Sequence, residues 1–171
     1  LGVRALHLLG AHKQWANRPL EWFGAIDVLV TATSWNNFWV LRLDAAAQPE
    51  MRALARVMSD AMFNSTPKRL ARGEWHLPYI SDEERNQYSM EELLKLSTAR
   101  CARLTIKPFD GSADYGAELK RWQKLLGSQP VHASPAEHQA TPDMRSPVTG
   151  KWLTPELHGN LDGWIQYRKS I

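Results

Sequence analysis

The sequence has a single cysteine, Cys101, in 171 residues, so it can form no internal disulfide and no cysteine-rich zinc site. It also lacks a run of about 18 apolar residues, which excludes a membrane-spanning helix. Excess charge is small, because 21 Lys and Arg face 18 Asp and Glu and leave a formal net charge of +3. That balance suits an anionic small molecule or a few phosphate contacts, and it does not call for nucleic acid. The lone thiol favours a reducing cytoplasm.

The amino-acid composition is that of an ordinary globular protein, with 43% hydrophobic and 23% charged residues. This length suits one domain with a real core, and we expect a single domain over residues 1–171. A helical pattern is already under way at Leu1, which favours a fragment, a processed chain or one piece of a split protein.

Apolar spacing predicts an α+β fold, with helices packed on a small mixed or antiparallel sheet. The β-branched run Ile26–Thr31 predicts a strand. Pro49 suits the first turn of a helix in which Met51, Leu54 and Met58 share one face. We expect this face to pack on the sheet that contains the strand.

Shorter signals place other helices. A helical pattern covers residues 1–15, and Ser34 is the expected N-cap of a helix through Arg42. Ser89 and Glu92 form a capping box, and Gly127 ends a helix that begins near Asp114. A short strand is predicted over residues 104–106, and a short helix over residues 134–139 in an otherwise proline-rich stretch.

Three segments carry residues that suit chemistry. In the first, Asn37 and Arg42 lie five residues apart on a helix, so their side chains are about 140° apart. One of them could face a cofactor while the other faces a substrate. The alternative is a half-buried helix with a surface arginine.

The second segment runs from His132 to Gln139. Ser134, Pro135 and Glu137 predict a capped helix start, where free N–H groups can bind a phosphate. The alternative is a helix start without a ligand. A metal site from His132, Glu137 and His138 lacks a third imidazole at ligand spacing.

The third segment, residues 159–169, interleaves aromatic and cationic residues. These side chains could stack on bases or on a flavin ring, or they could anchor the core. Cys101 is expected to be a buried structural thiol, because no partner for a nucleophile is identifiable.

Together, these segments resemble the flavin-dependent thymidylate synthases, in particular long phage-type relatives. Asn37-Phe38, Leu41-Arg42 and the following Gln48-Pro49-Glu50 are similar to the family's N-F-x-x-L-R signature and its A-Q-x-E helix. The segment His132–His138 is similar to the family's H-x-S/T-P-F-E-H element.

The resemblance implies roles for individual residues. Arg42 would be the catalytic residue, holding the uracil of dUMP and stabilising charge on its ring. The residues implied at the FAD cofactor are Asn37, Leu41, His132, Ser134 and Glu137, and those implied at the nucleotide are Arg18, Arg42 and Gln48. No metal is implied.

It also implies a fold and a reaction. The fold would be that of the thymidylate synthase-complementing proteins, and the reaction the reductive methylation of dUMP. Methylenetetrahydrofolate and NADPH would be co-substrates, and FAD would carry the redox step. The family implies a homo-oligomer, a tetramer with shared flavin sites, or completion by a complementing chain, with no membrane.

The sequence departs from the family pattern in three ways. The R-H-R-x-x-S motif is absent, and Trp164–Arg168 is the nearest text. The N-F-x-x-L-R segment precedes the S-P-x-E-H segment, and Ala46 stands where many members have a histidine. The chain would therefore lack the amino-terminal part that carries the Arg/His motif. The alternative function is a non-catalytic flavin- or nucleotide-binding or assembly subunit.

Overall fold

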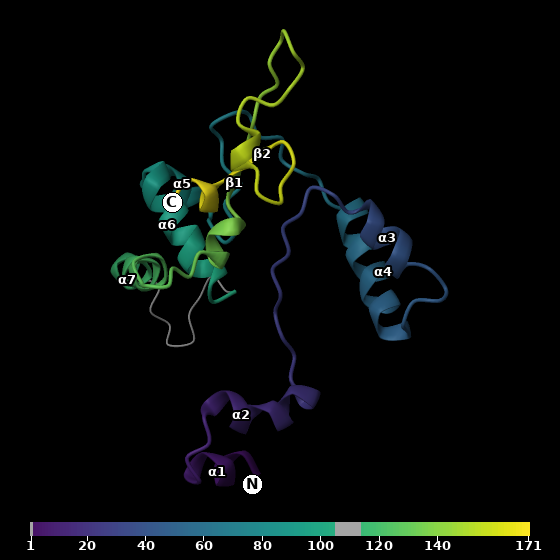
Figure 1. The fold of residues 1–171 in the computed structure, drawn as a ribbon, viewed down its shortest axis with the longest axis vertical. Helices are drawn as coiled ribbons and strands as arrows, with labels where there is room; N and C mark the ends of the chain where they lie inside the picture. Colours follow the sequence, from purple (N-terminus) through teal and green to yellow (C-terminus); the bar gives the residue numbers. More distant parts are fainter. Residues whose placement is uncertain (1, 105–113) are drawn as a thin grey trace.

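The computed structural model describes residues 2–104 and 114–171, without the side chains of residues 13, 14, 22 and 23. This part is mostly helical, with one two-stranded antiparallel sheet (Figure 1), so the α+β expectation is confirmed at this level. In chain order the elements are α1 (Gly2–Leu8), α2 (Lys13–Asn17), η1 (Arg18–Phe23), α3 (Asn36–Arg42), α4 (Pro49–Phe63), α5 (Asp82–Gln87), α6 (Met90–Cys101), α7 (Tyr115–Leu126), η2 (Ser134–Glu137), β1 (Ala140–Pro142), η3 (Pro155–Leu157), β2 (Trp164–Gln166) and η4 (Tyr167–Lys169).

The core lies around α6. Leu93 and Leu94 of α6 pack with Leu77, Ala136 and Tyr167, which come from far along the chain. Ser89 and Glu92 form the predicted capping box at the start of this helix. Burial of each large apolar side chain contributes roughly 1.5–3 kcal/mol, so this cluster anchors the main body.

Buried charges tie the neighbouring helices to α6. Arg100 of α6 donates two hydrogen bonds to the carboxylate of Glu84, at 2.6 and 2.8 Å, and one to the carbonyl of Tyr79. Glu118 of α7 pairs with Arg103 and with Arg121. Paired and hydrogen-bonded in this way, the charges avoid the penalty of lone burial.

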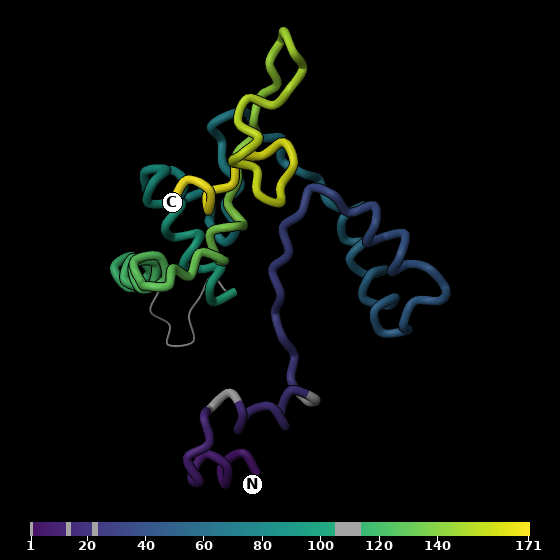
Figure 2. Tube along the Cα trace, in the orientation of Figure 1, coloured from purple at the N-terminus to yellow at the C-terminus, as the bar shows by residue number. Residues whose placement is uncertain are grey.

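The sheet is built from late residues only. Ala140 pairs with Gln166 and Pro142 with Trp164, while the backbone of His76 forms a bridge to Ala140. The predicted strand over Ile26–Thr31 is wrong as a sheet member, because these residues run extended (Figure 2) and pair with no strand in the described part of the chain. Strand propensity alone does not form a ladder. Two residues of the strand predicted over 104–106 lie outside the described part.

Helices α3 and α4 form a hairpin beside the body (Figure 1). Pro49 begins α4 as predicted, and Ala55 is buried in the hairpin. The predicted packing of the α4 face on a sheet is wrong: α4 contacts α3 instead, and Leu54 remains 53% exposed. Within residues 2–104 and 114–171 no strand lies beside α4 to cover this face, because the β1–β2 sheet belongs to the main body, apart from the hairpin (Figure 1).

Two other helix starts differ from the prediction. Trp35, rather than Ser34, is the N-cap of α3, and its ring stacks on Trp39 at 5.4 Å. The opening helical pattern splits into α1 and α2, because Gly10 between them takes a φ of +80°. The C-terminal stop at Gly127 is as predicted.

Candidate functional site

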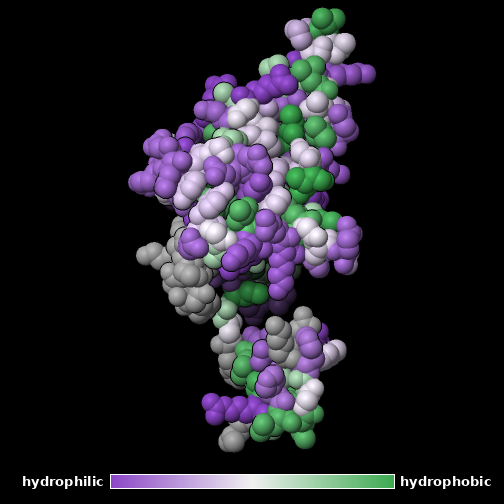
Figure 3. Space-filling view, turned by 90° about the vertical axis from the view of Figure 1, so that its left-hand side faces the viewer, coloured by the Kyte–Doolittle hydropathy of each residue, from purple (hydrophilic) through white to green (hydrophobic). Residues whose placement is uncertain are grey.

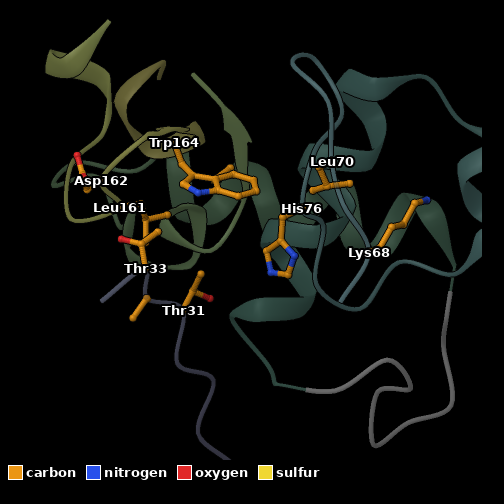
Figure 4. Close-up of a pocket in the computed structure, with 10 residues that line it drawn as sticks. Thr31, Thr33, Lys68, Leu70, His76, Leu161, Asp162 and Trp164 are labelled. Carbon is orange, nitrogen blue, oxygen red and sulfur yellow. The ribbon is translucent and has the colours of Figure 1, made fainter. Parts of the chain in front are cut away.

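A cavity of about 500 Å³ lies where three distant parts of the chain meet. Its walls are the end of the extended stretch before α3, the return segment after α4, and the β1–β2 sheet with the turn before β2 (Figure 4). We call it the central cavity, and its lining residues are Thr31, Ala32, Thr33, Lys68, Leu70, His76, Ala140, Leu161, Asp162 and Trp164. Its size falls in the range of small-molecule sites.

The lining combines an aromatic ring with a few polar groups. In Figure 4 the imidazole of His76 lies between Thr31 and Leu70, and the indole of Trp164 lies above Leu161. Lys68 and Asp162 stand at opposite edges of the same view. This lining suits a planar heterocycle that carries polar substituents.

A histidine pair lies at one side of this cavity. Thr31 Oγ1 and His138 Nδ1 are 3.0 Å apart, which ties the extended stretch to the body across 107 residues. Burial lowers the pKa of His138, and Arg168 adds to this shift against the opposing effect of Glu137. Burial also lowers the pKa of His76, with smaller contributions from Arg85 and His138. Both imidazoles are therefore neutral at neutral pH and can accept or donate a hydrogen bond.

Two of the segments singled out from the sequence meet beside the cavity. Glu137 accepts a hydrogen bond from Arg168 at 2.7 Å, and Gln166 Nε2 donates to the carbonyl of Glu137 at 2.9 Å. The Ser134–His138 segment and the Trp164–Arg168 segment therefore form one unit.

The predicted capping box at Ser134 is wrong. Ser134 begins a short 3₁₀ helix after Ala133, and its side chain makes no capping bond. The physical reason is that Ala133 occupies the N-cap, so Ser134 lies one position inside the helix, while the Glu137 carboxylate is paired with Arg168. Ser134 is exposed and takes no part in the Glu137–Arg168 pair. This short helix start therefore gives no support to the expected phosphate site.

His132 lies outside the central cavity. It lines a separate hollow with Arg121, Lys124, Leu125 and Ser128 at the end of α7. Its backbone N–H donates to the carbonyl of Leu125 at 2.9 Å. The structure thus separates His132 from Glu137, although both belong to the same sequence motif.

The remaining predicted site residues lie on the hairpin and the N-terminal segment. Asn37, Leu41, Arg42 and Gln48 are exposed on α3 and at the start of α4. Arg18 lies 4.5 Å from the ring centre of Trp15 in a cation–π contact. Since α3 stands apart from the η2–β1 region in Figure 1, one chain does not bring Arg42 next to Ser134 or Glu137.

Sequence reasoning missed Thr31, Lys68 and His76 as lining residues. Thr31 ends the run that predicted a strand, and Lys68 and His76 belong to no periodic pattern or recognisable motif, so none of the three was singled out for chemistry. Their proximity comes from the path of the hairpin, which leaves the body after Thr33 and returns at Lys68.

A second polar cluster supports the loop between β1 and β2. His158 Nε2 donates to Asp143 Oδ2 at 2.9 Å, because Nδ1 already accepts from the N–H of Gly163 at 3.1 Å. Burial raises the pKa of Asp143, but hydrogen bonds from Thr154, His158 and Met144 outweigh this effect and lower it to about 2. Both ring nitrogens of His158 are bonded within the chain, so the His158–Asp143 pair stabilises the conformation of this loop.

Cys101 is buried, as predicted, and burial raises the pKa of its thiol to about 11. Among residues 2–104 and 114–171, no three His, Cys, Asp or Glu side chains cluster as metal ligands. Within the same ranges, no helix is both long enough and apolar enough to cross a membrane.

Comparisons with models of known protein families, with curated protein sequences and with solved structures gave no match for this chain.

Proposed function

We propose that this chain is a flavin-dependent thymidylate synthase-like protein, or the carboxy-terminal part of one, which binds a flavin or a pyrimidine nucleotide at the central cavity. One observation carries the proposal: residues that flank the two segments of the resemblance line this cavity together with residues of segment 159–169. Thr31 and Thr33 precede the N-F-x-x-L-R segment, and Ala140 follows the S-P-x-E-H segment. Leu161, Asp162 and Trp164 belong to segment 159–169.

The cavity fits the ring system of such a ligand. It offers the indole of Trp164 for stacking, threonine hydroxyls for hydrogen bonds, and Lys68 for an anionic group. FAD, when bound, supplies the redox step for the reductive methylation of dUMP, with methylenetetrahydrofolate and NADPH as co-substrates. The chain's residues would position the rings and exclude water.

The proposal requires association. Within one chain Arg42 and Asn37 lie on the hairpin, away from Glu137, so a second copy or a complementing chain would complete the site. In the family this would be a tetramer. The proposal places the protein in the cytoplasm, where the nucleotide and the folate are found.

A second candidate is a non-catalytic flavin- or nucleotide-binding or assembly subunit. The exposed position of Arg42 and the absence of the R-H-R-x-x-S motif favour it. Flavin bound without turnover would support this candidate over the enzyme. A colourless protein that binds no nucleotide would leave only a structural role.

The test is titration of the purified chain with FAD and with dUMP, followed by flavin absorbance and by calorimetry. Trp164→Leu should weaken flavin binding about tenfold or more, because stacking on an aromatic ring contributes roughly 1–3 kcal/mol. Trp152→Leu is the matched control, since Trp152 packs edge-on against His158 and does not line the central cavity.

Equal affinities in the two variants would contradict the assignment of the ligand to this cavity. The unfolding midpoint of each variant shows that the body remains folded during the titration.

A further inference from the structure

The loop between β1 and β2 projects away from the main body (Figure 1), and we call its residues 144–153 the arm. Backbone hydrogen bonds join the two sides of the arm. The N–H of Ser146 donates to the carbonyl of Lys151 at 2.7 Å, and the N–H of Leu153 donates to the carbonyl of Met144 at 2.9 Å. The arm therefore has a defined shape, although it lies outside the core.

The arm holds a hollow of about 450 Å³ with a positively charged lining. The lining residues are Arg145, Thr149, Gly150, Lys151, Trp152 and Pro155. In the described chain, no Asp or Glu lines this hollow, and the arm itself contains none. Figure 3 shows the arm at the upper end of the molecule, where strongly hydrophilic residues lie beside hydrophobic ones. The hollow is thus open to a ligand from solvent, and its charge favours an anion.

The guanidinium of Arg145 is held in place by the arm itself. Its central carbon lies 3.9 Å from the ring centre of Trp152, and its Nη1 donates to the carbonyl of Gly150 at 3.0 Å. Arg145 and Trp152 also form a backbone bridge across the arm. This guanidinium pairs with no carboxylate in residues 2–104 and 114–171, so its other N–H donors are available. A group that is already positioned loses less entropy when it binds a ligand.

Lys151 and Thr149 add donors to the same hollow. The ammonium group of Lys151 forms no ion pair or hydrogen bond with any residue in the described ranges. Thr149 Oγ1 accepts from the N–H of Lys151 at 3.4 Å, so the hydroxyl proton of Thr149 remains available for donation. Arginine offers a planar fork of donors and lysine a point charge, and both bind phosphate oxygens well.

We propose that the hollow of the arm binds the phosphate group of a phosphomonoester, with Arg145, Lys151 and Thr149 as its donors. A phosphomonoester carries a charge of about −1.5 to −2 at neutral pH and three acceptor oxygens, which match two cations and a hydroxyl donor. A carboxylate has only one charge and two acceptor oxygens. The inference does not depend on the proposed function, because this hollow and the central cavity share no lining residue.

The test is an NMR titration of the whole chain with glycerol 3-phosphate, which follows the backbone amides of Gly150 and Lys151. These amide signals should shift and reach saturation. Lys151→Ala should raise the dissociation constant about tenfold or more, because a hydrogen bond to a charged group contributes roughly 1.5–3 kcal/mol. Lys120→Ala is the matched control, since Lys120 is exposed on α7, does not line the hollow and changes the net charge equally. Equal dissociation constants in the two variants, or no saturable shift in the wild-type chain, would overturn the proposal.

Two further probes test the chemistry of the ligand in the same titration. Acetate should bind about tenfold more weakly than glycerol 3-phosphate, because it has fewer charges and acceptors. An oligothymidylate without a terminal phosphate should also bind more weakly. Tighter binding of this oligonucleotide, with an affinity that falls steeply as salt increases, would overturn the phosphomonoester in favour of nucleic acid. A chain that binds neither flavin nor dUMP at the central cavity could still show the shifts of the arm, so the two proposals fail separately.

Discussion

Arg42 is the residue on which the proposed enzyme most depends. It lies exposed in the last turn of α3, and its side chain makes no hydrogen bond or ion pair with any other described residue. A guanidinium offers planar, paired donors that match the edge of a uracil or a phosphate. Its freedom within the chain leaves these donors available to a ligand.

Replacement of Arg42 should therefore affect turnover and not folding. In the assembled protein, with any complementing chain, Arg42→Ala should reduce the rate of dUMP methylation by about 10²–10³, as loss of a preorganised donor does. Arg42→Lys keeps the positive charge but loses the planar, paired donors of the guanidinium, so it should retain only part of the rate. Arg56→Ala, an exposed arginine on α4, is the control. Unchanged dUMP affinity and rate in Arg42→Ala would contradict the assigned role.

Asp143 gives a prediction about pH. Its pKa is about 2 in the folded chain, below the ordinary 3.8, so the ionised form stabilises the fold above pH 3.8. This contribution is lost as pH falls through the window from about 4 to 2. The thermal unfolding midpoint of the wild-type chain should therefore fall more steeply over this pH window than the midpoint of Asp143→Asn. Equal pH dependence of the two midpoints would show that the Asp143 carboxylate does not stabilise the loop.

At the scale of elements, the loop between β1 and β2 depends on one glycine. Gly163 has a φ of +81°, and a Cβ there would lie 2.9 Å from Trp152. Gly150 in the same loop has a φ of +67° and open space around it. Both alanine variants would have backbone strain, but only Gly163→Ala would also push against the Trp152 ring.

Gly163→Ala should thus lower the free energy of unfolding by about 1–2 kcal/mol more than Gly150→Ala, measured in urea. Similar losses in both would mean that the Trp152 ring moves aside at little cost.

Elements with strong local signals could be predicted from the sequence. Ser89 and Glu92 act within one helix turn, and Pro49 and Gly127 act through their own backbones, so no distant residue decides the outcome. The box at Ser134 failed because Ala133 is the N-cap of this short helix and because Arg168, 31 residues from Glu137, binds the Glu137 carboxylate. The sequence alone carries no sign of that competition.

At the scale of the whole molecule, the class of fold could be predicted but the site could not. Strand propensity identified the extended character of Ile26–Thr31, yet the partner of a strand depends on the rest of the assembly. The Thr31–His138 contact spans 107 residues, and nothing in the periodicity of either segment indicates it. The central cavity depends on such contacts, so Thr31, Lys68 and His76 went unrecognised, whereas Trp164 belongs to a segment that was singled out for stacking.

The hairpin leaves the body after Thr33 and returns at Lys68, and both residues line the central cavity. A ligand in the cavity would therefore contact both roots of the α3–α4 hairpin at once. Its affinity must then depend on the hairpin's orientation, and thermodynamic linkage makes the effect reciprocal. Whatever fixes the hairpin, including contact with another chain, would change ligand affinity by the same factor by which the ligand favours that orientation.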